Sequence, residues 1–139
     1  MQSPRPPIIL GGAAKKRGAA LAARYADEFN IAFKTDDVTR EGFGRIRTAV
    51  AETGRDVALS IGKCVCVGRT DAEVRSRADA IGRDVDELRE IQFAGTPAEV
   101  VDRIGTFAEM GASRLYLQFL DLTDIDQLEL IAAEVLPQL

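Results

Sequence analysis

Two glycines near the start of the chain end a short apolar run and stand directly before an alanine-rich segment. Residues 7–12 are Pro-Ile-Ile-Leu-Gly-Gly, and residues 13–26 are typical of a helix. A strand that turns into a helix through glycines leaves backbone N–H groups beside the positive end of the helix dipole, where a phosphate can bind. Lys15, Lys16 and Arg17 follow in the first turns, where the dipole disfavours cations unless an anion is bound. A tight left-handed turn followed by solvated surface cations explains the same residues equally well.

The rest of the sequence offers little catalytic chemistry. The chain has no histidine, which excludes Ser-His-Asp and Cys-His nucleophilic sites and every histidine metal site. Cys64 and Cys66 lie two residues apart and share one face of an expected strand, where a disulfide would be strained and two thiolates make a poor zinc site. We interpret both as small buried apolar residues. The sequence therefore predicts no metal site and assigns no catalytic residue.

Composition limits the class of protein. The 139 residues suffice for one domain, and 46% hydrophobic with 29% charged residues is ordinary for a globular protein. A net charge of −4 argues against nucleic acid or an anionic membrane as the main partner. No apolar run approaches the roughly 20 residues that span a bilayer. The N-terminus has no apolar segment of signal-peptide length before its prolines, so a cytoplasmic location is expected.

Strands and helices are predicted to alternate along the whole chain. The expected strands cover residues 8–10, 28–33, 57–67 and 114–120, and the expected helices cover residues 14–26, 39–53, 71–83, 85–91, 96–110 and 124–136. Thr39 is predicted to cap the second helix, and Gly54 to end it. Capping boxes are predicted at Thr70–Glu73 and at Thr96–Glu99, the latter with proline at the first helical position.

This alternation predicts an α/β fold with a mostly parallel sheet and right-handed crossovers. The third strand has bulky residues such as Leu59 and Ile61 on one face and small residues such as Ser60 and Cys66 on the other. Such a strand suits a barrel wall, with bulky residues toward outer helices and small ones inside. The helices at 71–83 and 85–91 form an insertion after this strand. Four strands cannot close a barrel, which takes eight units, so the sequence predicts an open four-stranded layer or half of something larger.

Several stretches resemble luciferase-like oxidoreductases, in particular the branch that depends on the deazaflavin coenzyme F420. The segment from Gln2 to Gly12 is similar to the one that enters the fifth strand of that family. Three further stretches agree in order and spacing: Ala-Ala-Arg-Tyr-Ala-Asp at 22–27, Gly-Thr-Pro-Ala-Glu-Val at 95–100 and Tyr-Leu-Gln-Phe-Leu-Asp-Leu at 116–122. The chain departs from the family at 27–30, which are Asp-Glu-Phe-Asn where relatives often have Asp-Gly-Trp-Asn. It departs again at Gln127, where a histidine is expected.

The resemblance implies one luciferase-like domain over residues 1–139, apparently truncated: the C-terminal half of a TIM (β/α)₈ barrel, strands five to eight. In the family, most contacts to the redox ring and the usual catalytic side chains come from the other half. What the resemblance implies for this half is the site that binds the phosphate end of the coenzyme. Its residues would be Gly11 and Gly12, with Lys34 and Thr35 after the second strand. A solvated loop lysine is an equally good interpretation of Lys34. Tyr116 and Gln118 are better explained as polar residues of the barrel interior.

The implied function is hydride transfer between coenzyme F420, or alternatively FMN, and a small organic substrate. The alternative is a catalytically inactive half-barrel that acts only by association. The outer edges of the strands at 8–10 and 114–120 are expected to be unpaired and therefore open to association. The expected partner is a second copy of the chain or a complementary N-terminal half-barrel.

Overall fold

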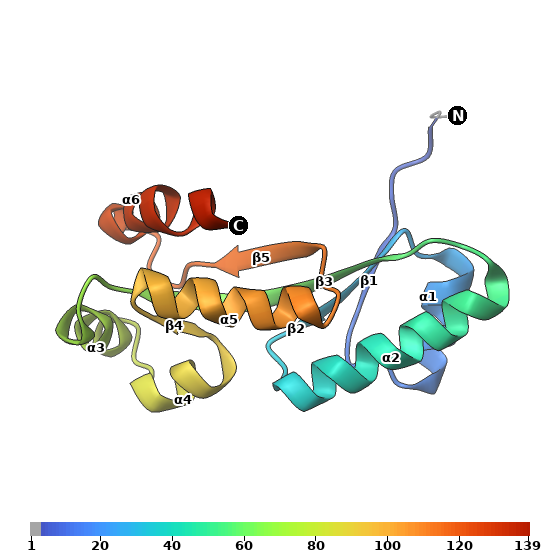
Figure 1. The fold of residues 1–139 in the computed structure, drawn as a ribbon, viewed down its shortest axis with the longest axis horizontal. Helices are drawn as coiled ribbons and strands as arrows, with labels where there is room; N and C mark the ends of the chain where they lie inside the picture. Colours follow the sequence, from blue (N-terminus) through green and yellow to red (C-terminus); the bar gives the residue numbers. More distant parts are fainter. Residues whose placement is uncertain (1–3) are drawn as a thin grey trace. The chain divides into compact units, whose positions relative to one another are not determined.

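The computed structural model describes residues 4–139, in which strands and helices alternate as expected (Figure 1). Gln2, which belongs to the resemblance above, lies outside the described residues. The elements in chain order are β1 (Ile9–Gly11), α1 (Lys16–Tyr25), β2 (Glu28–Ala32), α2 (Asp36–Thr53), β3 (Ala58–Val67), α3 (Asp71–Ala80), α4 (Val85–Ile91), β4 (Phe93–Gly95), α5 (Pro97–Glu109), β5 (Arg114–Gln118), α6 (Ile125–Glu134) and the 3₁₀ turn η1 (Leu136–Gln138).

The strands form one sheet with the neighbour order β1-β2-β3-β4, and β5 also pairs with β3. The pairs β1–β2, β2–β3 and β3–β4 are parallel, with Leu10 opposite Phe29 and Phe29 opposite Leu59. The predicted strands correspond to β1, β2, β3 and β5, so the parallel α/β fold with an insertion after the third strand is confirmed. β4 was not predicted, because three residues are too few to show a strand periodicity.

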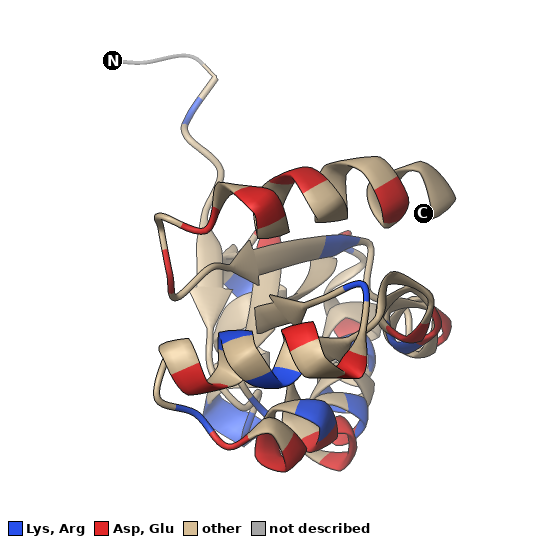
Figure 2. Ribbon diagram, turned by 90° about the vertical axis from the view of Figure 1, so that its left-hand side faces the viewer, with Lys and Arg blue, Asp and Glu red and all other residues tan. Residues whose placement is uncertain are grey.

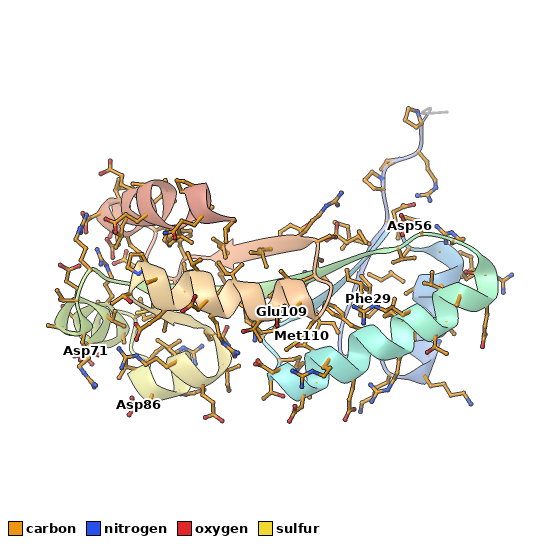
Figure 3. All side chains as sticks on the ribbon, viewed as in Figure 1. Phe29, Asp56, Asp71, Asp86, Glu109 and Met110 are labelled. Atoms are coloured by element: carbon orange, nitrogen blue, oxygen red, sulfur yellow. The ribbon has the colours of Figure 1, made fainter. Side chains whose placement is uncertain are left out.

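The chain divides into two compact units, of which the first comprises residues up to Gly62 together with Met110–Tyr116. Helices α1 and α2 lie side by side in this unit (Figure 1). Its core is formed by the bulky residues of one sheet face and of α2. The largest are Phe29, Ile31, Phe43, Ile46 and Ile61, each at most 1% exposed. Figure 3 labels Phe29 on the strand side of α2. The prediction that bulky strand residues face the outer helices is confirmed in this unit.

Two glycines of α2 differ in what surrounds them, which allows a stability prediction. A Cβ at Gly42 would lie 2.5 Å from the Ile31 side chain and 3.3 Å from the Ala14 Cβ, whereas a Cβ at Gly44 would meet nothing within 4 Å. We expect Gly44→Ala to raise the free energy of unfolding by about 0.5–1 kcal/mol, because alanine loses less backbone entropy in a helix. We expect Gly42→Ala to lower it by about 1 kcal/mol, because overpacking outweighs that gain. Urea unfolding of both variants is the measurement, and equal effects would contradict the packing at Ala14.

The second unit comprises Lys63–Glu109 and Leu117–Leu139. α4 has the predicted bounds, and α3 begins with its predicted cap, where Thr70 accepts a hydrogen bond from the Glu73 backbone. The capping box of α5 is also confirmed: the Thr96 N–H donates to the Glu99 carboxylate at 2.7 Å, and the Glu99 N–H donates to the Thr96 hydroxyl at 3.5 Å. The Phe93 and Phe107 rings pack in a T-shaped arrangement with centroids 5.8 Å apart, and both residues are fully buried.

Three sequence predictions need correction. α2 is capped by Thr35, four residues before the predicted cap Thr39, because Thr35 accepts from the Val38 N–H and Asp36 and Asp37 extend the first turn. The second strand was expected to run from residue 28 to residue 33, but β2 ends at Ala32. At Phe33 the backbone turns to φ 55° and leaves the side chain 46% exposed.

The third correction concerns the small-residue face of β3. Both cysteines are buried and unbridged, as predicted. Cys66, however, does not line an open interior: it packs in a cluster with Val74 and Ala78 of α3 and Leu88 of α4. The inserted helices therefore cover the small-residue face at the carboxyl end of β3. Every residue from Leu59 to Val67 is buried.

Within residues 4–139, none of the helices combines the length and the apolar character that crossing a bilayer requires.

Candidate functional site

The carboxyl end of β1 leads into α1 through a loop that its glycines shape. Gly12 has φ +136°, a conformation that side chains disfavour, and a Cβ placed there would meet no atom within 4 Å. Its N–H donates to the Asn30 carbonyl at 3.1 Å, which ties the loop to β2. A Cβ at Gly11 would make an ordinary contact of 3.5 Å with the Asn30 oxygen, so this position does not require glycine sterically.

The N-terminus of α1 has no side-chain cap. The N-cap position is Lys15, which makes no capping hydrogen bond, and the first turn contains no acidic residue. At this end of the helix, the Ala19 N–H donates to the Lys15 carbonyl at 2.9 Å. The N–H groups of Lys16, Arg17 and Gly18 therefore have no partner within the helix. An N-terminus with bare N–H groups and adjacent cations can hold an anion.

The loop packs firmly against α2. Ala14 is 2% exposed, has φ 47° and lies where a Cβ at Gly42 would touch it. A non-glycine residue with positive φ is strained and persists only where its surroundings determine it. Phe33, directly after β2, is the other described non-glycine residue with positive φ. The strained positions thus follow the carboxyl ends of two neighbouring parallel strands, the edge where ligands bind in parallel α/β folds.

The residues after β2 differ from those after β1 in their electrostatics. Thr35 caps α2, and its carbonyl accepts from the Thr39 hydroxyl at 2.9 Å. Asp36 and Asp37 occupy the first turn of α2. These carboxylates oppose a second anion at the N-terminus of α2, whereas α1 carries only cations. Of the four predicted residues, Gly11 and Gly12 therefore precede the helix end whose charges are the more favourable to an anion. Lys34 is exposed at the same edge, and Thr35 has a structural role as a cap.

The sequence reasoning missed a polar cluster on the sheet face opposite α1 and α2. Glu28 is 1% exposed, and its carboxylate accepts from the Ser60 hydroxyl at 2.6 Å, the Tyr116 hydroxyl at 2.9 Å and the Arg114 guanidinium. The Asn30 amide donates to the same Ser60 hydroxyl at 3.0 Å. One signal in the sequence could have identified this cluster. Glu28 is a charged residue at the start of β2, and the other residues on its face of the strand, Asn30 and Ala32, are polar or small.

The protonation state of Glu28 follows from these contacts. Burial by itself raises the pKa of the Glu28 carboxyl, but the hydrogen bonds from its three partners outweigh burial and hold the pKa below its ordinary value. The same contact raises the pKa of Tyr116, because its hydroxyl donates to a carboxylate. Glu28 is therefore ionised at neutral pH and orients its neighbours; it is unsuited to act as a general acid there.

A second polar network lies in the second unit, at the end of β3. The Val67 N–H donates to the Gln127 side-chain oxygen at 2.8 Å, and the Val67 carbonyl accepts from Arg77 at 2.9 Å. Arg77 also donates to Asp124 at 2.7 Å, which holds the pKa of Asp124 below its usual value. Gln127, at the position where the resemblance predicted histidine, is 4% exposed and bound to the backbone. Its amide thus completes the hydrogen bonding of β3.

The fold places the chain in the class of α/β proteins. Its parallel sheet with intervening helices matches about half of a (β/α)₈ barrel. The profile of the family described as luciferase-like monooxygenase matches residues 1–87. The chain belongs to the luciferase-like monooxygenase family. No curated protein sequence matches this chain.

Solved structures with low sequence identity share the fold. An F420-dependent secondary alcohol dehydrogenase in complex with an F420–acetone adduct aligns with TM-score 0.76 and 15% identity, over 98% of this chain and 49% of its own. The coenzyme F420-dependent tetrahydromethanopterin reductase of Methanopyrus kandleri aligns with TM-score 0.72 and 16% identity, over 94% and 50%. The oxygenating constituent of 3,6-diketocamphane monooxygenase from Pseudomonas putida, in complex with FMN, aligns with TM-score 0.64 and 18% identity, over 94% and 48%. The chain thus spans about half the length of these proteins.

Proposed function

We propose that this chain supplies the coenzyme-phosphate site of an oxidoreductase that uses F420, or alternatively FMN, on a small organic substrate. The observation that carries the proposal is the N-terminus of α1, which is uncapped, lacks acidic residues and follows the Gly11–Gly12 loop directly. Solved relatives of the same fold are named for F420 or carry FMN, both of which have phosphate groups.

The residues around the N-terminus of α1 fit a phosphate group. The N–H groups of the first turn of α1 point out of the helix end and can each donate to a phosphate oxygen. Gly12 leaves open space beside them, since a side chain there would meet no protein atom within 4 Å. Lys34, at the end of the neighbouring strand, would add a cation, and the Thr35 hydroxyl would lie at the rim while it caps α2. Asp36 and Asp37 restrict the anion to the α1 side.

When bound, the coenzyme carries the redox chemistry as a hydride donor or acceptor. The contribution of this chain is binding and orientation: a rigid loop held by the Gly12–Asn30 hydrogen bond and by the Ala14–Gly42 contact positions one end of the coenzyme. We therefore assign no catalytic residue to it.

Coenzyme titration tests the proposal. We expect FMN to bind at least about tenfold more tightly than riboflavin, which lacks the phosphate, a difference of about 1.4 kcal/mol. Gly12→Val should remove most of this preference, because valine disfavours φ +136° and its side chain fills the space beside the N–H groups. Fluorescence quenching measures both affinities, and the same titration with F420 decides between the coenzymes, because the coenzyme that the site is built for binds more tightly.

Gly54→Val is the matched control. Gly54 also has positive φ, +65°, and its Cβ would also meet open space, but it ends α2 rather than preceding α1. The control should therefore lose stability without losing the preference for phosphate. Binding of neither F420 nor FMN would overturn the proposal, and so would binding of FMN with the same affinity as riboflavin if FMN is the coenzyme that binds.

The second candidate, an inactive half-barrel that acts through association, is favoured by exposed apolar positions on the first and last helices.

A further inference from the structure

Phe33, directly after β2, is unfavourable in both its backbone and its side chain. Its backbone has φ 55°, a conformation in which a bulky residue is strained. Its ring is 46% exposed, whereas the ring of Phe29 on the same strand is 1% exposed. The strain costs free energy, and the exposed ring forgoes the gain that burial of a phenylalanine brings. Positions that break local rules in this way are typical of functional sites.

The neighbours of Phe33 fix this conformation. Its N–H donates to the Gly62 carbonyl at 2.9 Å, which continues the pairing of β2 with β3 beyond the end of the strand. Two residues later, the side chain of Thr35 already caps α2. The backbone must therefore turn from strand to helix at once. An extended residue 33 would share the buried face of Phe29, and the turn leaves its ring exposed instead.

Phe33 lies at the same edge of the sheet as the candidate phosphate site, and both belong to the first unit. β1 and β2 are parallel neighbours, with Gly11 opposite Asn30, and the Gly12 N–H donates to the Asn30 carbonyl. Phe33 follows Asn30 by three residues, a rise of about 10 Å along an extended chain. A coenzyme of nucleotide size spans such a distance. A ligand whose phosphate binds at the N-terminus of α1 can therefore reach the Phe33 ring with its uncharged part.

The strand ends beside Phe33 suit an uncharged group. β1 has the sequence Ile-Leu-Gly, and the charged residue of β2, Glu28, lies at the amino end of that strand. Figure 2 shows that the acidic and basic residues lie mostly on the helices. The residues next to Phe33 are small, since a Cβ at Gly62 would lie 3.1 Å from the Ala32 Cβ. A planar ring beside Phe33 would thus meet small, uncharged residues of the sheet.

We propose that the Phe33 ring packs against the aromatic ring of the coenzyme whose phosphate the N-terminus of α1 holds. This inference rests on the proposed function and adds a second contact to the same ligand. Two aromatic rings in an offset-stacked or edge-to-face arrangement gain free energy beyond that of burial alone. The fixed backbone presents the Phe33 ring before the coenzyme arrives, so less conformational freedom is lost on binding.

Replacement of the ring tests the proposal by titration with FMN and riboflavin, or with F420 and its phosphate-free deazaflavin core if F420 is the coenzyme that binds. Phe33→Asn removes the ring and keeps the turn, because asparagine tolerates positive φ. It should raise both dissociation constants by the same factor, about tenfold, and leave their ratio unchanged. Phe33→Trp keeps an aromatic face and should bind within about threefold of the unaltered chain. The melting temperature of Phe33→Asn should rise by about 3 °C, because the strain is relieved.

Tyr25→Asn is the matched control. Tyr25 is an aromatic residue of similar exposure, 47%, at the last position of α1, the end of the helix away from the Gly11–Gly12 loop. Its substitution should leave both dissociation constants unchanged.

Four results would overturn the assignment of Phe33: unchanged affinity of Phe33→Asn for both ligands, a lower melting temperature together with lost binding, a loss confined to the phosphorylated ligand, or an equal effect of the control. Equal affinity of the unaltered chain for the phosphorylated and the phosphate-free ligand would overturn the phosphate site alone, because the effect of Phe33→Asn is still measured with the phosphate-free ligand. Binding of no flavin or deazaflavin would overturn both.

Discussion

Arg77→Met lowers the free energy of unfolding by about 3 kcal/mol, the first of the two largest effects that we expect. The Arg77 side chain is 15% exposed and donates to the Val67 carbonyl and to Asp124, whose side chain is 18% exposed. Methionine keeps much of the apolar stem but leaves a carbonyl without its donor and a half-enclosed carboxylate without its counter-charge. Breaking one partner of such a pair costs more than the pair itself contributes. Urea unfolding monitored by circular dichroism measures the loss.

Arg75→Met separates this network from an ordinary surface ion pair. Arg75 lies on the same helix and pairs with Asp71, labelled on α3 in Figure 3, but its side chain is 52% exposed. Exposed pairs of this kind contribute about 0.5 kcal/mol, so the control should remain within that range. A loss at Arg77 no larger than the loss at Arg75 would mean that the network at the end of β3 does not stabilise the fold.

Glu28→Gln lowers the free energy of unfolding by about 2 kcal/mol at pH 7, the second large effect. The substitution preserves shape but replaces a carboxylate that accepts from Ser60, Tyr116 and Arg114 with an amide that must also place two N–H donors. Ser60 is fully buried, so it cannot turn to water for a replacement acceptor. The loss is below that of a fully enclosed ion pair, because the Arg114 side chain is 60% exposed and becomes solvated.

The pH dependence of the same variant gives an independent check. The pKa of Glu28 is lower in the folded chain than in the unfolded chain, so its contribution is fully present above the unfolded pKa of about 4.3 and is lost as the pH falls through the folded pKa. The difference in unfolding free energy between the unaltered chain and Glu28→Gln should therefore be constant near neutrality and shrink below about pH 4.3. Glu41→Gln, at a side chain that is 67% exposed and pairs with Arg45, is the control and should show a negligible difference at every pH.

Local signals in the sequence predicted most of the elements. The capping boxes at Thr70 and Thr96, the left-handed Gly54 at the end of α2 and the apolar spacing of the helices depend on residues close in the chain, and all three are present in the structure. The cap of α2 was placed four residues late, because Thr35 and Thr39 carry the same capping chemistry. Two features decide which threonine begins the helix: Asp36 and Asp37, which lie between the two threonines and favour the first turn, and the end of β2 at Ala32.

The sequence by itself determined the alternating α/β pattern, the glycines that turn β1 into α1 and the absence of histidine chemistry, because these depend on residue type and short spacing. Only the tertiary structure revealed that Glu28 meets Arg114 and Tyr116, that Cys66 lies under α3 and α4 and that Gln127 binds the end of β3. These contacts join residues 8 to 88 positions apart in the chain. A buried polar group bonds to whichever partner the fold brings next to it, and a local sequence pattern does not predict that partner. The strain at Ala14 and Phe33 likewise arises from packing that overrides the preference of each residue for negative φ.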